Sequence, residues 1–257
     1  MRQSAVPALH AASLFALLGL AAPVFAQSAA KPPEVRAASA DLNGDGKAEK
    51  IAISFAGQNP VRFTLSVNSV KLADKADDFC DESQGFQIVK IDASAKTRQI
   101  AVRFQGPSDA EETRFYRWNG STIRRVGVVE RAVAVSGNGV VYAGIWMGFW
   151  QCAQKFALDS KTQTLAFVRQ PAYYVGVPAT VKQTFPVRQD HTAASGIVAS
   201  VVPGSKIQLL LFWAASARPE TSRETNGWYL IKTVTGLCGW ARLDSFREKV
   251  EGLPYAG

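Results

Sequence analysis

Short segments in which apolar and polar residues alternate recur along the chain. Residues 50–55, 62–70 and 113–118 alternate in this way, which is the period of a β-strand with one buried face. Asn119-Gly120 follows the last of these segments and precedes 121–126, and this pair predicts a hairpin with a type I′ turn. Further strands are predicted at 206–213, 227–234 and 238–242. The pattern therefore predicts an all-β protein.

The first 26 residues follow a different pattern. Arg2 precedes an apolar stretch over 11–25, and Val24 and Ala26 supply small residues at its end, which predicts a cleavable signal peptide over 1–26. An uncleaved anchor helix is the alternative, but such a helix needs about 20 apolar residues. No later segment is long and apolar enough to span a bilayer. We therefore expect an exported protein, periplasmic or secreted, without a membrane span after signal removal.

Composition narrows the range of partners. Removing 26 of the 257 residues leaves 231, and the formal net charge falls from +8 to +7 because Arg2 is lost. That length suits one large domain or two small ones. The basic excess is compatible with anionic surfaces such as lipid head groups or cell-wall polymers. However, no basic run of five or more exists, so we expect no nucleic-acid partner and interpret these residues as solvated strand faces.

Catalytic constellations are difficult to build from this chain. After the signal peptide, His191 is the only histidine. A Ser-His-Asp site or a multi-histidine zinc site would have to be built around it. His191 lies in the polar segment 189–196, which is typical of a surface loop. We therefore predict no catalytic residue and no enzyme activity.

The three cysteines are Cys80, Cys152 and Cys238. Export places them in an oxidising compartment, where a disulfide persists. Three cysteines allow at most one internal disulfide, and the sequence does not select the pair. We predict a Cys80–Cys152 disulfide, because both residues fall in the first module as delimited below. Three buried thiols are the alternative.

Oxygen-bearing side chains recur at alternate positions in 41–49. They fall at positions 1, 3, 5 and 9 of a calcium-binding loop, position 7 offers a backbone carbonyl, and Gly46 at position 6 permits the sharp turn. Position 12 is Ala52 instead of the bidentate Glu. The predicted ligands of a structural calcium ion are Asp41, Asn43, Asp45, Lys47 and Glu49. The alternative is a polar turn that binds nothing.

A loop of this type followed by a strand resembles the FG-GAP or VCBS repeats of integrin-like β-propellers. Those families carry Asp-x-Asn-x-Asp-Gly-x-x-Asp, and Glu49 here replaces the last Asp. A weaker copy at 91–102 aligns without gaps with 42–53, and a period near 50 suits a propeller blade. The copy has lost the ligands, and two copies cannot close a propeller. The resemblance implies an incomplete propeller-like module over 38–184, after a linker at 27–37.

The C-terminal segment resembles a bacterial SH3-like (SH3b) domain. Its hallmarks are Pro203-Gly204 before a strand, Trp228-Tyr229 within a strand, and a closing strand that here reads Gly239-Trp240-Ala241. The resemblance covers 185–250 and implies a small SH3-like β-barrel. Such modules bind cell-wall peptides or other protein ligands. The residues expected to contact a ligand are Trp213, Trp228 and Trp240, although Trp228 and Trp240 suit a core equally well.

Together these features predict a non-catalytic exported binding protein of the cell envelope, whose partner is a cell-wall peptide or an envelope protein. Two alternatives remain: a structural subunit of an envelope complex, and an envelope hydrolase that uses paired carboxylates. The carboxylates available for a hydrolase are Asp77, Asp78, Asp81, Glu82, Asp109, Glu111 and Glu112. The aromatic segment 144–150 is predicted to pack in a core, with sugar stacking as the alternative.

Overall fold

The computed structural model describes residues 34–57, 60–108, 110–214 and 227–255. The predicted signal peptide and residues 27–33 of the predicted linker lie outside the described residues. The described chain is all-β, as expected. Its helical elements are α1 (Leu243–Phe246) and the short 3-10 helix η2 (Arg247–Lys249). Neither helix is long and apolar enough to cross a membrane, a finding limited to the part of the chain that the structure describes.

The first twelve strands form three antiparallel sheets of four consecutive strands. The first sheet contains β1 (Ala37–Ala40), β2 (Glu49–Ala56), β3 (Arg62–Val67) and β4 (Val70–Lys75). The second contains β5 (Glu82–Val89), β6 (Gln99–Gln105), β7 (Glu111–Trp118) and β8 (Ile123–Val129). The third contains β9 (Val133–Val135), β10 (Val140–Trp146), β11 (Gln151–Leu158) and β12 (Leu165–Val168). Each sheet is therefore a simple meander.

β7 and β8 form the predicted hairpin, but the turn between them differs from the expected type. The side-chain oxygen of Asn119 accepts the backbone N–H groups of Ser121 (3.0 Å) and Thr122 (2.8 Å). Gly120 has a positive φ of 96°, whereas Asn119 does not. A type I′ turn requires positive φ at both central residues. The connection is therefore a longer loop closed by the Asn119 side chain, and the predicted turn type is wrong.

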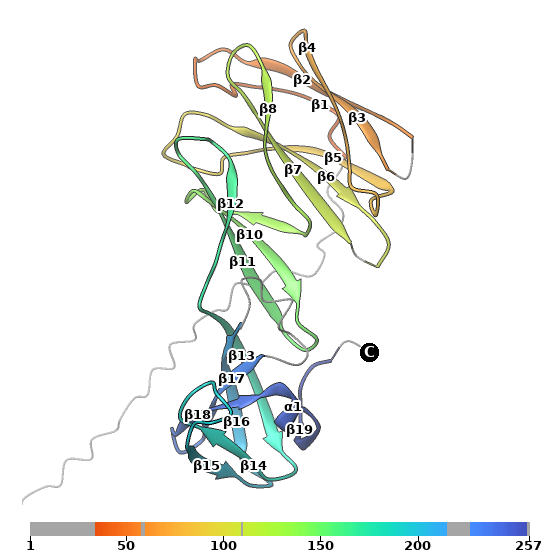
Figure 1. Ribbon diagram of the computed structural model, residues 1–257. Helices are drawn as coiled ribbons and strands as arrows, with labels where there is room; N and C mark the ends of the chain where they lie inside the picture. Colours follow the sequence, from red (N-terminus) through yellow and green to blue (C-terminus); the bar gives the residue numbers. More distant parts are fainter. Residues whose placement is uncertain (1–33, 58–59, 109, 215–226, 256–257) are drawn as a thin grey trace, which may run out of the picture.

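Apolar clusters join the sheets in chain order. One cluster lies between the first and second sheets and includes Phe63 of β3 and Phe104 of β6, whose ring centroids lie 5.3 Å apart. A second cluster joins Phe115 of β7 to Val141 and Phe156 of the third sheet. Figure 1 shows the sheets following one another along the molecule, with the C-terminal strands at the opposite end from β1–β4.

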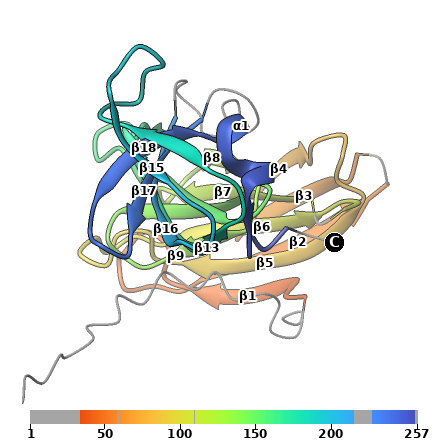
Figure 2. The same cartoon turned by 90° about the horizontal axis from the view of Figure 1, so that it is seen from below.

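The remaining strands form one seven-stranded antiparallel sheet in the order β15-β14-β18-β17-β16-β13-β19. They are β13 (Ala172–Val181), β14 (Phe185–Arg188), β15 (Ile197–Val201), β16 (Lys206–Trp213), β17 (Trp228–Thr233), β18 (Cys238–Arg242) and β19 (Val250–Glu251). The sheet is strongly curved, with α1 beside it (Figure 2). Within the described residues, however, strand pairing does not close it into a barrel.

The boundary between the two parts lies earlier than the sequence predicts. β13 falls inside the predicted first module, 38–184, but pairs with β16 over most of its length and with β19 near its end. The C-terminal part therefore begins near residue 172 and not at residue 185. The predicted linker also contributes to packing, because Val35 forms a β-bridge with Gly85 of the second sheet.

The aromatic segment 144–150 joins the third sheet to the C-terminal sheet. Phe149 and Trp150 are buried, as the core interpretation predicts, whereas Trp146 is 41% exposed. The Phe149 ring lies 5.6 Å from that of Tyr229 in β17, and the indole N–H of Trp150 donates to the Tyr229 hydroxyl at 3.3 Å. These residues belong to the same apolar cluster as the C-terminal core.

The predicted Cys80–Cys152 disulfide is wrong for this structure, in which none of the three cysteines forms a disulfide. Cys80 is buried in the cluster between the first two sheets. Cys152 is buried in the cluster at the far end of the third sheet. Cys238 is exposed. The two buried thiols belong to different cores, so they are not brought together.

Candidate functional site

Three strands of the C-terminal sheet bring the predicted tryptophans to one face. Trp213 of β16 lies opposite Trp228 of β17, and Leu230 of β17 lies opposite Trp240 of β18. Residues opposite one another in an antiparallel pair share a face, and so do residues two apart on a strand. The three tryptophans and Leu230 therefore share one face. We call this face of the C-terminal sheet, together with the side chains that cover or extend it, the aromatic surface.

The aromatic surface is separate from the core of the same sheet. Phe212, Tyr229 and Ala241 alternate with the tryptophans along the strands and are buried in the C-terminal core. The tryptophans themselves are only partly buried. Large apolar side chains on the side of a sheet opposite to its core are not needed to fill that core. They are what a recognition surface requires.

The loop between β14 and β15 places His191 over this surface. The His191 ring centroid lies 4.3 Å from that of Trp213 and 5.5 Å from that of Trp240. The Asp190 carboxylate lies 2.5 Å from Nδ1 of the imidazole. Arg188 donates to the carbonyl of Ser195 at 2.7 Å, which ties down the base of the loop. His191 is thus a surface-loop residue, as expected, but it also bridges two of the tryptophans.

The aromatic surface continues beyond the tryptophans. Tyr174 of β13, which is 51% exposed, lies opposite Leu211 of β16. On the other side, Arg188 of β14 lies opposite both Trp240 and Ile197, and Ile197 is 59% exposed. The shared register extends one apolar face from β13 across the sheet to β15, and it carries two arginines, Arg188 and Arg242, the latter opposite Trp228.

The predicted calcium loop, 41–49, is closed by its own hydrogen bonds. The two carboxylate oxygens of Asp41 accept the N–H groups of Gly44 (2.7 Å) and Gly46 (3.0 Å). Asn43 accepts the N–H of Asp45 at 3.1 Å. Asp45 in turn accepts the N–H of Lys47 at 2.8 Å and the Asn43 side-chain amide at 3.0 Å. These bonds lower the pKa of Asp45, mainly through the Lys47 N–H and then through Asn43.

Glu49 makes a different contact from the other predicted ligands. It is 5% exposed, and its carboxylate accepts the buried N–H of Leu42 at 2.8 Å. Gln99, at the equivalent position in the second sheet, accepts the N–H of Ile91 at 3.1 Å. The equivalent of Glu49 is therefore Gln99, one residue beyond the Arg98 that the gapless alignment assigns. An uncharged amide performs the same task in the second copy, which identifies this contact as a staple that closes the loop.

These residues fit a calcium ion in part. Each carboxylate oxygen of Asp41 and Asp45 has two lone pairs and uses one on an N–H group, so acceptor capacity for a cation remains. Glu49 is directed toward Leu42, and Lys47 lies on the exposed part of the loop. Among the described residues, no group of three or more His, Cys, Asp or Glu side chains is placed to hold a metal. Calcium binding stays a prediction from the sequence.

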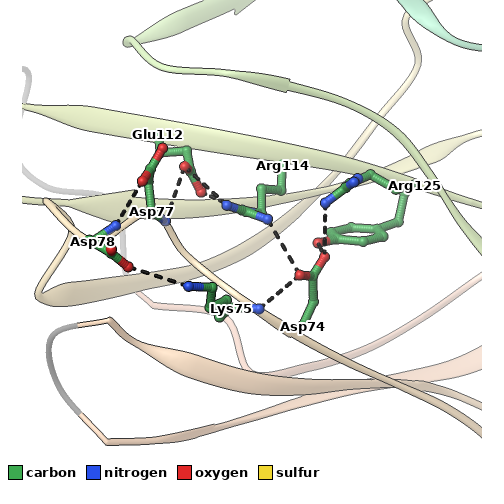
Figure 3. Close-up of polar contacts among 8 residues, drawn as sticks. Asp74, Lys75, Asp77, Asp78, Glu112, Arg114 and Arg125 are labelled. Carbon is green, nitrogen blue, oxygen red and sulfur yellow. Dashed lines mark hydrogen bonds and ion pairs between the residues drawn. The ribbon is translucent and has the colours of Figure 1, made fainter.

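A charged cluster lies between the first two sheets (Figure 3). Arg114 of β7 forms an ion pair with the fully buried Glu112 and lies 3.4 Å from Asp74 of β4. The Tyr116 hydroxyl donates to Asp74 at 2.8 Å, and Arg125 of β8 lies 3.7 Å from the same carboxylate. Burial disfavours the Arg114 charge, but the hydrogen bond and charge of Glu112, together with the charge of Asp74, raise the pKa of Arg114 above its ordinary value. The cluster clamps the two sheets together.

The carboxylates considered for a hydrolase are partly gathered here. The N–H of Asp77 donates to Glu112 at 3.2 Å, so the two acidic segments meet. Yet Glu112 is fully buried and paired with Arg114, which suits a structural role. Glu111 lies 3.6 Å from Arg103, Asp78 lies 3.4 Å from Lys75, and Asp109 lies outside the described residues. Asp81 and Glu82 are exposed at the start of β5.

Comparison with known proteins assigns the chain to no family, because no protein-family model and no curated protein matches it. The sequence interpretation missed the clamp and the bridging position of His191. Alternation along 111–118 places Glu112, Arg114 and Tyr116 on one face of a strand. Three polar side chains on the face of a largely buried strand are the sequence pattern that could have predicted the clamp. The approach of His191 to Trp213 depends on a loop conformation that no comparable pattern of residues indicates.

Proposed function

We propose that the protein is a non-catalytic, exported binding protein that acts at the cell envelope and contacts its ligand through the aromatic surface. The observation that carries the proposal is the convergence of Trp213, Trp228 and Trp240 on one side of the C-terminal sheet, away from its core. Tryptophan is enriched at binding hot spots, where it contributes a large contact area at a low entropic cost.

An SH3-like interpretation of the C-terminal sheet supports this proposal. β16, β17 and β18 form a meander, β13 pairs with both β16 and the short β19, and a helical turn precedes β19. The resemblance to SH3b domains covers only 185–250 and does not include β13, and residues 215–226 of the segment lie outside the described part. Fold resemblance alone is a weak argument for function, so the proposal rests on the three partly buried tryptophans of the aromatic surface.

The first three sheets serve as a platform in this proposal. Three consecutive four-stranded meanders favour a propeller-like but incomplete module, because each resembles a single blade. We further propose that the 41–49 loop binds calcium as a structural ion, held through the remaining lone pairs of Asp41, Asn43 and Asp45. Calcium would then add rigidity to the first sheet without taking part in ligand contact.

The ligand class is a cell-wall peptide or a peptide segment of an envelope protein. Co-sedimentation of the mature chain with purified peptidoglycan tests the first source. We expect binding, and we expect Trp228→Ala to weaken it at least about tenfold, as truncation of a hot spot does. Trp146→Ala is the matched control, because Trp146 is also accessible to solvent but lies on β10, outside the aromatic surface.

Failure of the wild-type chain to co-sediment would exclude the cell wall and leave an envelope protein as the partner. Equal loss of binding in Trp228→Ala and Trp146→Ala would contradict the assignment of the aromatic surface. Thermal unfolding of both variants shows whether each remains folded during the comparison.

A further inference from the structure

The outward face of the first sheet has an unusual distribution of charge. All of β1–β4 lies in the described part of the chain. Its outward strand positions carry four cations, Lys50, Arg62, Lys71 and Lys75, and no carboxylate. The two acidic residues within these strands, Glu49 and Asp74, point to the inward side, where they accept hydrogen bonds from Leu42 and Tyr116. The outward face is therefore uniformly basic.

An open hollow of about 320 Å³ lies on this face at the end of the sheet. Ser54 and Ala56 of β2, Thr64 of β3 and Ala73 of β4 line it, and their short side chains leave the space above the sheet open. Arg62 and Lys75 also line it, together with Phe63 and Asp74. The last two have inward side chains, so they contribute backbone to the floor.

Arg62 and Lys75 lie side by side on neighbouring strands, and both line the hollow. They are partners in the register of β3 and β4, and like charges at such positions destabilise a sheet. Lys75 has a counter-ion in Asp78 at 3.4 Å, but both side chains are more than half exposed, so this pair contributes little. On the inward side, Asp74 forms ion pairs with Arg114 and Arg125, so its charge does not neutralise the hollow. The hollow therefore retains an excess of positive charge.

Hydroxyl groups complete the set of donors. Ser54 lies opposite Thr64, which lies opposite Ala73, so both hydroxyl groups belong to the row next to Arg62 and Lys75. Ser66, one row further along β3, donates to the carbonyl of Ala52 at 3.1 Å. No described hydrogen bond engages the hydroxyl of Ser54 or Thr64. Two cations and two hydroxyl donors from three strands thus line one open space.

We propose that this hollow is a binding site for a phosphate group. Arg62 supplies a planar guanidinium that pairs with two oxygens of one phosphate. Lys75 supplies a second charge from the opposite strand, and Ser54 and Thr64 donate to the remaining oxygens. Four donor side chains on three neighbouring strands can reach more than two oxygens, which suits a tetrahedral oxyanion better than a planar carboxylate. The bound anion would also neutralise the repulsion between Arg62 and Lys75. This site is separate from the aromatic surface and does not depend on its function.

Phosphate titration of the ¹⁵N-labelled mature chain at constant ionic strength tests the site. We expect saturable shifts of the amide signals of Ser54, Thr64 and Ala73. Arg62→Gln should weaken binding about tenfold, whereas Lys71→Gln, which removes an equal charge from the same face outside the hollow, should change it less than about twofold. Shifts without saturation, or an equal effect of both variants, would refute a specific site.

Thermal unfolding supplies a second readout of the same proposal. In phosphate-free buffer, Arg62→Gln should raise the Tm by about 1–3 °C, because it removes the like-charge pair. Phosphate should then stabilise wild type and Lys71→Gln more than it stabilises Arg62→Gln. If phosphate stabilises all three equally, its effect is the general one of an excluded salt and the site is refuted.

Vesicles distinguish the two sources of the phosphate group. Co-sedimentation with vesicles of phosphatidylglycerol in phosphatidylcholine, compared with phosphatidylcholine alone, tests a lipid phosphate. Binding that depends on Arg62 supports a lipid headgroup as the source. Saturable binding of inorganic phosphate without vesicle binding supports a soluble phosphate or phosphate ester.

Discussion

The hydrogen bond between Glu49 and Leu42 makes a quantitative prediction about the first loop. Leu42 is fully buried, and its N–H donates to the Glu49 carboxylate at 2.8 Å. Glu49→Ala leaves this N–H without its acceptor inside the protein. A buried unsatisfied donor costs about 1–3 kcal/mol. For a chain of this size, that loss lowers the Tm by about 2–4 °C for each kcal/mol.

Glu49→Gln separates the hydrogen bond from the charge. The glutamine carbonyl can accept the same N–H, as Gln99 does for Ile91 at 3.1 Å. We expect this variant to lose less than about 1 kcal/mol, the difference between a charged and a neutral hydrogen bond. Gln99→Ala should be as destabilising as Glu49→Ala. Lys47→Ala, at an exposed position of the same loop, should change stability by less than about 0.5 kcal/mol.

Urea unfolding followed by tryptophan fluorescence measures these differences, with a constant m-value as evidence that only stability has changed. Equal destabilisation by Glu49→Gln and Glu49→Ala would refute the staple. Repeating the series with calcium and with EDTA tests the ion separately. If calcium stabilises wild type and Asp45→Ala abolishes that gain while Glu49→Gln retains it, Glu49 is a staple beside a calcium site. Abolition by Glu49→Gln would instead make Glu49 a ligand.

Three further predictions concern other parts of the molecule. A thiol reagent should modify only Cys238 in the native chain, because Cys80 and Cys152 are buried and burial raises the pKa of Cys80 to about 12. After unfolding without reductant, the reagent should modify all three cysteines. Modification of a single thiol after unfolding would show that a disulfide is present. Arg114→Met should cost about 3–5 kcal/mol in urea unfolding, because it leaves the buried Glu112 charge unpaired. The matched change Arg103→Met, which affects a more exposed pair, should cost at most about 1 kcal/mol, and similar costs would contradict the clamp. Three donors lower the pKa of Asp159: the N–H of Thr162, its hydroxyl and the N–H of Lys161. The Asp159 carboxylate therefore stabilises the fold above its unfolded pKa of about 3.9. This stabilisation is lost as the pH falls through the folded pKa. Urea midpoints from pH 2 to pH 7 should therefore separate wild type from Asp159→Asn at neutral pH and converge in acid.

The sequence predicts strands well where one face is buried and the other is solvated. The bounds of β16 and β18 agree with the predicted segments, and β2 differs by one residue at each end. The third sheet was not predicted, because β10 is buried at most positions and does not alternate. Its burial depends on packing against other sheets, which a periodicity argument cannot include.

Non-local pairing explains the other differences. β13 was placed in the wrong module because its partners, β16 and β19, lie about 30 and 70 residues later in the chain. The second copy of the loop was found, but its register was wrong by one residue, because the staple at Gln99 follows a loop one residue longer. The three tryptophans were selected from sequence resemblance, and strand register brings them together. The hollow between Arg62 and Lys75 depends on which residues face each other across two strands.

The buried aromatic segment has a consequence for how the two parts of the chain can be separated. Met147, Phe149 and Trp150 belong to the third sheet by sequence but complete the core beneath β16 and β17. A fragment beginning at residue 172 would lose these side chains and open a cavity against Tyr229 and Phe212. It would therefore be a poor autonomous folding unit, and the two parts should unfold in a single cooperative transition. A recombination breakpoint that respects this core lies before β9, so that the third sheet moves with the C-terminal strands.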